Sequence, residues 1–353
     1  MKTSINILLA FLFAACTSVP DERIMSYVNF PETRELTART LSLDSALFRY
    51  PYRVRVQDSK AIVFDLHGTD YFFHAFHYPD FHYLSSFGKR GDAPEEMLSA
   101  ENLRWNGNFL WTLDSNKSEL TRLGFASSGD SLLRLEAVSL DEELLRALDF
   151  VQYDDSTFII PDYSGDSRFC LVSRQGKLLR KIGTIPTTNE DALKSARPAL
   201  AQAWRSFIDY NPHNGILVAA TQLGEVLEIY NLKDSTHLAC IGPNGEPEFQ
   251  ISQGYGIPTG IMGFSDIQVT DNAIYVVFQG HAFKDIMQKA QQGINLPNGG
   301  QNIYVFSLEG KPLRKYVLDH YIHGISVDEQ KDIVIATDVN KDEPIIEYRL
   351  NSI

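Results

Sequence analysis

The sequence predicts an all-β fold, a six-bladed β-propeller of four-stranded antiparallel blades. Three observations lead to this prediction: an apolar strand-like run recurs six times, a more polar strand precedes each run, and a hairpin follows all but the last. Successive runs begin 48, 48, 59, 57 and 59 residues apart, which is typical of a repeat built from one small sheet. The runs are Lys60-AIVFDLH-Gly68, Asn108-FLWTLDS-Asn116, Ser156-TFIIPDYS-Gly165, Gly215-ILVAATQL-Gly224, Asn272-AIYVVFQ-Gly280 and Lys331-DIVIATDV-Asn340.

The preceding strands are the first element of each unit, and each ends at or near a turn-forming Asp, Asn or Gly. The apolar runs are the second strands. They lack the alternation of apolar and polar residues that is typical of a sheet with one solvent-exposed face, which indicates that both of their faces are covered. A sheet that is apolar on both faces is stable only beside similar sheets, and radial packing of six units supplies such neighbours. The first strands are YRVRVQD from Tyr52, ENLRWNG from Glu101, LDFVQYDD from Leu148, RSFIDYNP from Arg205, FSDIQVTD from Phe264 and HGISVDE from His323.

The sixth unit is incomplete, because the chain stops after Ile345-IEYRL-Asn351 and leaves no residues for an outermost strand. The segment Ala38-RTLSL-Asp44 is strand-like and precedes the first unit. We expect it to pair with the last blade and close the ring, which would protect two open sheet edges.

The N-terminus has the pattern of an export signal. Lys2 is followed by an apolar run from Ile7 to Ala15, which is too short to span a bilayer, so residues 1–15 are predicted to be a signal peptide. The stretch Phe13-Ala14-Ala15-Cys16 resembles a bacterial lipobox, which predicts lipidation at Cys16. The alternative is an ordinary signal peptide cut nearby. Residues 16–37 are interpreted as a lipidated N-terminus and flexible tether, and residues 38–353 as the propeller.

The net charge of the chain excludes some classes of binding partner. The 353 residues carry 32 Lys and Arg against 45 Asp and Glu, a formal charge of −13, which argues against binding to nucleic acid or to anionic lipid. Contact with a membrane is therefore expected only through the N-terminal lipid, and the predicted location is a bacterial membrane, the outer one, with its side left open. Cys170 and Cys240 each lie in an apolar run and are interpreted as small core residues, although export would permit a disulfide.

Four segments resemble the TolB-like six-bladed propeller lipoproteins of Bacteroides-type bacteria, over roughly residues 40 to 350. The segments are Ser86-FGKRGDAPEE-Met97, Trp204-RSFIDYNP-His213, Gly263-FSDIQVTDNAIYVVFQ-Gly280 and the stretch SLEGKPLRKYVLD after Phe306. The first of them departs from the family's usual GKGPGE by losing one glycine at residues 92–95. The resemblance implies the fold and the location in the cell envelope, and it implies no particular ligand.

The long irregular segments are expected on one face of the ring, because loops between blades and loops between second and third strands emerge together. They are residues 89–100, 184–203, 243–261 and 281–301. Two of them contain helix signals: Asn189 is a candidate N-cap for a helix over 189–197 that stops before Pro198, and residues 283–292 have apolar residues at helical spacing. Long loops on a rigid scaffold usually carry function. The apolar stripe of residues 283–292 is expected to pack on the propeller rather than to hold a partner. The predicted ligand-binding residues of this face are Arg90, Glu95, Asp162, Arg197, Tyr255, His281, Lys284 and Asp338.

Signals for catalysis are few. His67, His74, His77 and His82 crowd the first blade, but residues 74 and 77 of one strand point to opposite faces. Asp338, Asn340 and Asp342 resemble the start of a calcium loop without its later glycine and glutamate. We therefore predict no cofactor, metal or catalytic residue, and a non-catalytic envelope lipoprotein that binds a protein or glycan. The alternative is a propeller hydrolase or lyase that acts on a saccharide or lactone, with a bound calcium ion.

Overall fold

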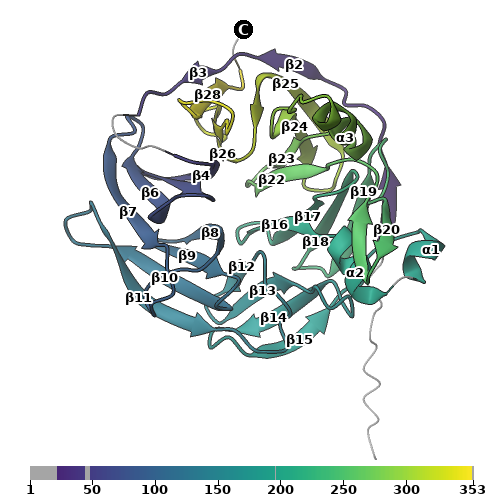
Figure 1. The fold of residues 1–353 in the computed structure, drawn as a ribbon, viewed down its shortest axis with the longest axis horizontal. Coiled ribbons are helices and arrows are strands. Elements are labelled where there is room, and N and C mark those ends of the chain that lie inside the picture. The colour runs from purple at the N-terminus through teal and green to yellow at the C-terminus, as the bar shows by residue number, and fades with distance from the viewer. Residues whose placement is uncertain (1–21, 44–47, 195, 352–353) are drawn as a thin grey trace, which may run out of the picture.

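A computed structural model describes residues 22–43, 48–194 and 196–351 of the chain. Six antiparallel sheets stand around a central axis in the order of the sequence, and the first strand of each sheet lies nearest the axis (Figure 1). The prediction of a six-bladed propeller is confirmed.

Each blade is built from four strands. Blade 1 consists of β4 (Pro51–Gln57), β5 (Lys60–Asp65), β6 (Tyr71–His77) and β7 (Tyr83–Lys89). Blade 2 consists of β8 (Ala100–Asn106), β9 (Phe109–Asp114), β10 (Glu119–Phe125) and β11 (Leu132–Ser139). Blade 3 consists of β12 (Val151–Asp154), β13 (Thr157–Pro161), β14 (Phe169–Ser173) and β15 (Leu178–Ile182).

The second half of the ring repeats the pattern. Blade 4 consists of β16 (Ser206–Asn211), β17 (Ile216–Thr221), β18 (Val226–Asn231) and β19 (Thr236–Ile241). Blade 5 consists of β22 (Phe264–Val269), β23 (Ala273–Phe278), β24 (Gly300–Ser307) and β25 (Pro312–Ile322). Blade 6 consists of β26 (Ile325–Asp328), β27 (Ile333–Thr337), β28 (Ile345–Arg349) and the N-terminal β3 (Arg39–Thr40).

The ring is closed as predicted. Strand β3 pairs antiparallel with β28, where Thr40 lies opposite Ile346, and the Leu41 amide donates to the Ile345 carbonyl at 2.9 Å. The outer strand of the last blade thus comes from the start of the chain, and backbone hydrogen bonds within the sixth blade hold the two ends of the ring together.

The interpretation of residues 16–37 as a flexible tether is wrong from residue 22 onward. Strand β1 (Glu22–Ser26) pairs in parallel with β19, and β2 (Thr33–Leu36) pairs in parallel with β25, so each adds a fifth strand to its blade. The exposed outer edges of blades 4 and 5 supply the backbone hydrogen-bonding partners for these strands. The sequence of the segment is polar and has no period, so it gives no sign of this pairing. We call residues 22–40 the N-terminal belt. Residues 1–21, which include the predicted signal peptide and Cys16, lie outside the described residues.

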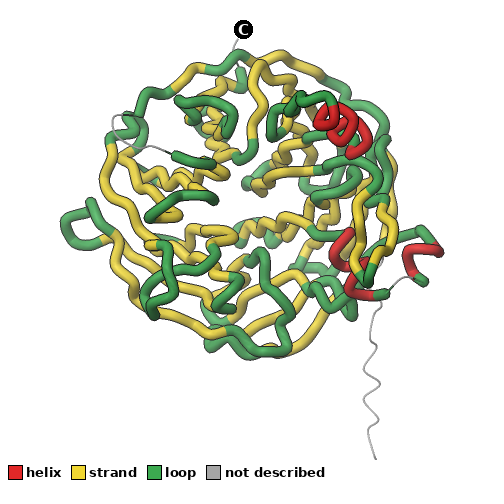
Figure 2. The backbone as a smooth tube through the Cα atoms, viewed as in Figure 1, coloured by secondary structure: helices red, strands yellow, loops and turns green. Residues whose placement is uncertain are grey.

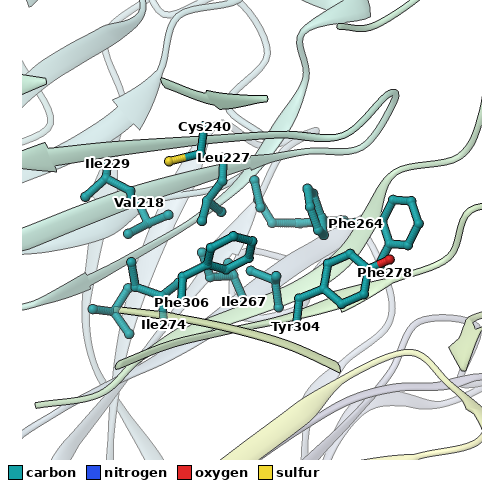
Figure 3. Close-up of a cluster of buried hydrophobic side chains, with 14 of the residues drawn as sticks. Val218, Leu227, Ile229, Cys240, Phe264, Ile267, Ile274, Phe278, Tyr304 and Phe306 are labelled. Atoms are coloured by element: carbon teal, nitrogen blue, oxygen red, sulfur yellow. The ribbon is translucent and has the colours of Figure 1, made fainter. Parts of the chain in front are cut away.

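The core lies between neighbouring blades. Strands β17 and β23 are buried along their whole length, which confirms that second strands are covered on both faces. One such interface joins blades 4 and 5, where Val218 and Leu227 face Ile274 and Phe306 (Figure 3). Cys240 belongs to the same cluster and, like Cys170, is buried and unpaired, as the interpretation of both as small core residues predicted. Burial raises the pKa of both thiols to about 12.

Three helices occur in the described part of the chain, and Figure 2 places them beside blades 4 and 5. They are α1 (Glu190–Leu193), α2 (Arg197–Ala203) and α3 (Phe283–Gln291). Within the described ranges, none is long and apolar enough to cross a bilayer.

Candidate functional site

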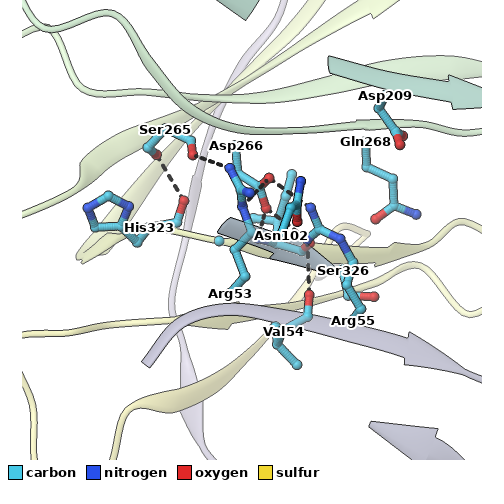
Figure 4. A network of polar contacts seen from close by, with 12 residues as sticks. Arg53, Val54, Arg55, Asn102, Asp209, Ser265, Asp266, Gln268, His323 and Ser326 are labelled. Carbon is cyan, nitrogen blue, oxygen red and sulfur yellow. Dashed lines mark hydrogen bonds and ion pairs between the residues drawn. The ribbon is translucent and has the colours of Figure 1, made fainter. Parts of the chain in front are cut away.

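The axis of the ring is occupied by buried arginines and aspartates from the innermost strands. In blade 5, Asp266 accepts hydrogen bonds from both terminal nitrogens of Arg55 at 2.9 and 2.8 Å, and its carboxylate lies 3.0 Å from Arg53 Nε (Figure 4). Burial alone would raise the pKa of Asp266, but the two guanidinium groups outweigh it and hold that pKa well below its usual range. Asp266 is therefore a fixed anion between two fixed cations.

A second pair of contacts repeats this arrangement on the other side of the axis. Arg104 of blade 2 donates to Asp149 of blade 3 at 3.1 Å and to Asp209 of blade 4 at 2.6 Å, and it also donates to the Phe150 and Ile208 carbonyls. Burial raises the pKa of Asp209 although Arg104 opposes that shift. The ion pairs of Arg104 therefore link blades 2, 3 and 4 at the axis.

A cavity of about 920 Å³ opens at one end of the axis, beyond this charged layer. Its walls are the ends of the innermost strands and the turns that join them to the second strands, and Arg55, Arg104 and Asp209 also line it. All six blades contribute a turn to its rim, represented by Asp58, Gly107, Asp155, Pro212, Asp271 and Glu329. The turns after first strands emerge opposite to the loops after second strands in an antiparallel blade, so this mouth faces away from the long loops.

The opposite end, which we call the loop face, carries the four long loops that the sequence singled out and the loop of residues 140–150. The loops bond to one another: the Thr188 hydroxyl donates to Glu246 at 2.6 Å, and the Phe283 amide donates to the Gly260 carbonyl at 3.0 Å. The third of the long loops folds into a hairpin of β20 (Phe249–Ser252) and β21 (Tyr255–Pro258). The loops thus form one continuous surface.

Helices were correctly predicted in two of these loops, with differences in detail. Asn189 caps α1 by accepting hydrogen bonds from the Asp191 and Ala192 amides at 3.0 and 3.1 Å. Pro198 was expected to follow the end of this helix, but it lies in the first turn of α2, where its missing N–H leaves no bond unmade. The stripe on α3 was expected to pack on the propeller, yet none of its residues is buried and Met287 is 63% exposed.

Three of the predicted site residues are held by local structural contacts. Asp162 is buried, forms an ion pair with Lys181 at 3.1 Å and accepts the Ser164 amide at 3.0 Å. Asp338 is buried and contacts His320 Nδ1 at 2.8 Å. Arg90 donates to the Gly68 carbonyl at 2.9 Å and lies 4.1 Å over the ring of Phe72. In this structure these side chains shape loops of the face.

The other five lie on or near the surface of the loop face. Glu95, Lys284 and Tyr255 are exposed, and Arg197 forms an exposed ion pair with Asp166 at 2.9 Å. His281 is partly buried and stacks on Tyr321 with 5.9 Å between ring centroids, and burial lowers its pKa. These residues come from several loops and do not converge on one pocket among the described residues.

Neither metal hypothesis gains a ligand cluster in the described part of the chain, where no group of three His, Cys, Asp or Glu side chains is placed to hold an ion. His74 Nδ1 contacts the Ser86 hydroxyl at 2.8 Å and His77 contacts Asp80 at 2.7 Å, each from its own side of β6. Asp338 accepts both the backbone and side-chain N–H groups of Asn340 at 2.9 and 2.8 Å, so this stretch forms a hydrogen-bonded turn.

Exposed apolar side chains gather on the loop face. Of the sixteen large hydrophobic residues that are exposed in the described structure, eight belong to its loops, namely Leu98, Leu145, Leu193, Ile251, Tyr255, Ile257, Met287 and Ile294. Isolated apolar residues on a surface are ordinary, but a concentration on one rim is typical of a surface that contacts another molecule.

The cavity and the charged axis were not predicted from the sequence. The signal was present, because a charged residue interrupts three first strands at corresponding places, Arg55, Arg104 and Asp209, and Asp266 interrupts another near its start. The first strands were predicted only to be more polar than the second, and the closed ring shows that these charged residues meet one another.

Comparison with known proteins agrees with this architecture. A family model described as TolB-like 6-blade propeller-like matches residues 29–330. A search of curated proteins found no match. Among solved structures, a "Putative exported protein" from Bacteroides fragilis superposes with a TM-score of 0.58 at 10% identity, covering 92% of this chain and 98% of the other.

Two further structures share the fold. A member of the DUF4221 family from Bacteroides vulgatus gives a TM-score of 0.53 at 10% identity, covering 89% of this chain and 95% of that one. The WD40 repeats of RRP9 give 0.51 at 9% identity, covering 88% and 96%. Identities this low establish the fold and nothing about a ligand.

Proposed function

Because the chain belongs to the family of TolB-like six-bladed propellers, we propose that it is an exported, non-catalytic binding protein of the cell envelope that holds a protein partner on its loop face. Export is supported by the apolar run before Cys16 and by the name of the Bacteroides fragilis protein with the same fold. Lipidation of Cys16 would attach the protein to the membrane, which the sequence motif supports.

The concentration of exposed apolar side chains on the loop face carries the proposal. The β20–β21 hairpin presents Ile251, Tyr255 and Ile257 at 47, 61 and 40% exposure, and α3 presents Met287. The backbone bond between Gly260 and Phe283 joins the hairpin loop to the start of α3, so the two elements are neighbours on the loop face. Tyr255 and Ile257 share one face of the hairpin, and Ile251 lies on the other. Aromatic and Met side chains are enriched in protein–protein interfaces, and this surface offers one of each, Tyr255 and Met287, beside its exposed Leu and Ile side chains.

The rigidity of the ring supports the same function. Loops that stand on six packed sheets lose little conformational freedom when a partner binds, so a larger share of the contact energy appears as affinity. Glu95, Arg197 and Lys284 add charges of both signs around the apolar residues, which is the composition of an interface rim.

The proposal is tested by partner capture from the protein's own membranes with three versions of the chain. Met287→Asp places a charge on the exposed side of α3, and we expect it to reduce capture of the partner about tenfold or more, because a buried, unpaired charge at an interface is costly. Leu179→Asp is the matched control, since Leu179 is 57% exposed on the outer strand of blade 3, away from the loop face. Equal capture by Met287→Asp and wild type would refute the role of this surface.

A further inference from the structure

We propose that the cavity at the mouth opposite the loop face is a second binding site, for a non-acidic oligosaccharide. The site is independent of the protein surface proposed above, because it is lined by different residues at the other end of the axis. A volume of about 920 Å³ lies at the upper end of the range for pockets that hold small ligands, so the cavity has room for several sugar units.

The polar side chains that line the cavity differ from one side to the other in how many already have a hydrogen-bond partner within the protein. On the side of blades 5 and 6, Asn272 donates to Glu329 at 2.8 Å, Gln268 bonds both polar groups of Val327 at 3.0 and 2.7 Å, and Lys331 pairs with Asp328 at 2.8 Å. These contacts join one blade to the next or fix a turn. This side of the wall offers few free hydrogen-bonding groups.

The side of blades 2 and 3 is different. The indole nitrogen of Trp105 and Oε1 of Gln152 are buried polar atoms without a hydrogen-bond partner. The side chains of Asn106 and Asp155 line the same wall and have no partner among the described residues. Asn106 is half-buried and Asp155 is exposed, so both side chains are accessible to a polar ligand in the cavity. The unpaired atoms of Trp105 and Gln152 depart, on the same side of the ring, from the usual pairing of buried polar groups.

The types of these groups point to a sugar. A hydroxyl both donates and accepts hydrogen bonds, and a wall that combines the Asn106 amide with the Asp155 carboxylate offers both roles. The rings of Tyr153 and Tyr210 lie on the neighbouring wall with 5.6 Å between their centroids and a tilt of 50° between their planes, and the face of either ring offers an apolar surface for the C–H face of a sugar ring.

The charge of the lining excludes acidic ligands. Seven carboxylates but only three Lys and Arg side chains line the cavity, and all three cations, Arg55, Arg104 and Lys331, are already paired with aspartates. A uronic acid or a phosphate would meet a negative field without a free cation to offset it. Among oligosaccharides, the cavity therefore favours neutral chains over acidic ones.

Tryptophan fluorescence gives a direct readout. The chain has three tryptophans, of which Trp111 and Trp204 are 2 and 0% exposed in other parts of the ring, whereas Trp105 lines the cavity. We expect a saturable fluorescence change with at least one of maltotriose, cellotriose, mannotriose and triacetylchitotriose, and none with trigalacturonate. Trp105→Phe abolishes the fluorescence change, while calorimetry still detects binding of the same sugar.

Two variants locate the site. Asn106→Ala and Asp155→Ala each remove one uncommitted group and should weaken binding about three- to tenfold, which is the effect of one lost hydrogen bond. Glu95→Ala, an exposed acid on the loop face, is the matched control and leaves sugar affinity unchanged. The proposal is overturned if none of the four neutral sugars binds at millimolar concentration, if trigalacturonate binds as well as they do, or if trilysine binds in their place.

Discussion

At the scale of single residues, the ring depends on what the backbone N–H groups along the inner edges of the innermost strands bond to. Such a strand has no neighbour toward the axis, so its backbone N–H groups lack ladder partners. Side chains from the preceding blade take that role: Asp149 accepts the Ile208 amide at 3.0 Å, Asp209 the Val269 amide at 2.7 Å and Asp266 the Ile325 amide at 2.9 Å. Each aspartate thus joins its blade to the next, and an arginine neutralises its charge.

We expect Asp266→Asn to destabilise the fold by about 3–5 kcal/mol, because it leaves the buried guanidinium groups of Arg53 and Arg55 without their anion. The asparagine oxygen can still accept the Ile325 amide, so the loss measures the charge. Urea unfolding checks this, with Asp271→Asn as a control at an exposed acid, where a change below about 1 kcal/mol is expected. Similar losses for both variants would contradict the argument.

At the scale of elements, the N-terminal belt is the least expected part of the fold. Its apolar side chains bind it to the ring: Tyr27 and Leu36 are 6 and 4% exposed, and the Tyr27 hydroxyl donates to Glu225 at 2.8 Å. Phe30 packs on Tyr304 of blade 5 with 4.6 Å between ring centroids. The belt therefore covers the outer edges of two blades with both backbone pairing and apolar contacts.

A chain that begins at residue 38 retains β3 and the closed ring but exposes the edges of β19 and β25. We expect it to unfold at a lower urea concentration than a chain that begins at residue 22, and to self-associate through the open edges. Unfolding curves combined with sedimentation would reveal both effects. An unchanged midpoint in a monomeric protein would show that the belt adds nothing to stability.

The sequence predicted those elements whose pattern is local. The second strands, the ring closure by residues 38–44 and the helix capped by Asn189 follow from apolar runs, an unpaired last unit and a capping residue. The belt was missed because parallel pairing along an existing edge needs only a few anchors, such as Tyr27 and Leu36, and no periodicity. The cavity and the Arg–Asp contacts were missed because each involves residues from different blades, which the linear spacing does not relate.

At the scale of the whole molecule, the two faces of the ring differ in chemistry. The loop face collects exposed apolar side chains, while the opposite mouth is hollow, polar and acidic. Because strand β1 runs parallel to β19, with Glu22 opposite His237 and Ser26 opposite Ile241, the belt begins at the end of blade 4 that carries the cavity mouth and proceeds toward the loop face. A membrane anchor at the start of the chain would therefore hold the cavity mouth, and not the loop face, near the membrane.

With a lipid on Cys16, the orientation on a membrane becomes predictable. Six residue steps separate Cys16 from Glu22 and span at most about 20 Å. The six residues of β19 rise roughly 20 Å from the start of the belt to the base of the loops, so the tether is too short for the loop face to lie flat on the bilayer. We expect the loop face to point away from the membrane, where a protein partner can reach it.

Labelling of single introduced cysteines in vesicle-bound protein tests this orientation, since Cys170 and Cys240 are buried and their pKa is raised to about 12, which leaves them unreactive. A fluorophore at Lys311→Cys, in the turn between β24 and β25 on the side of the cavity mouth, should be quenched strongly by a quencher carried on lipid headgroups. A fluorophore at Ser252→Cys, on the loop-face hairpin, should be quenched weakly. Stronger quenching at Ser252→Cys would reverse the predicted orientation, whereas a wild-type chain that binds vesicles no better than Cys16→Ser would instead remove the lipid anchor itself.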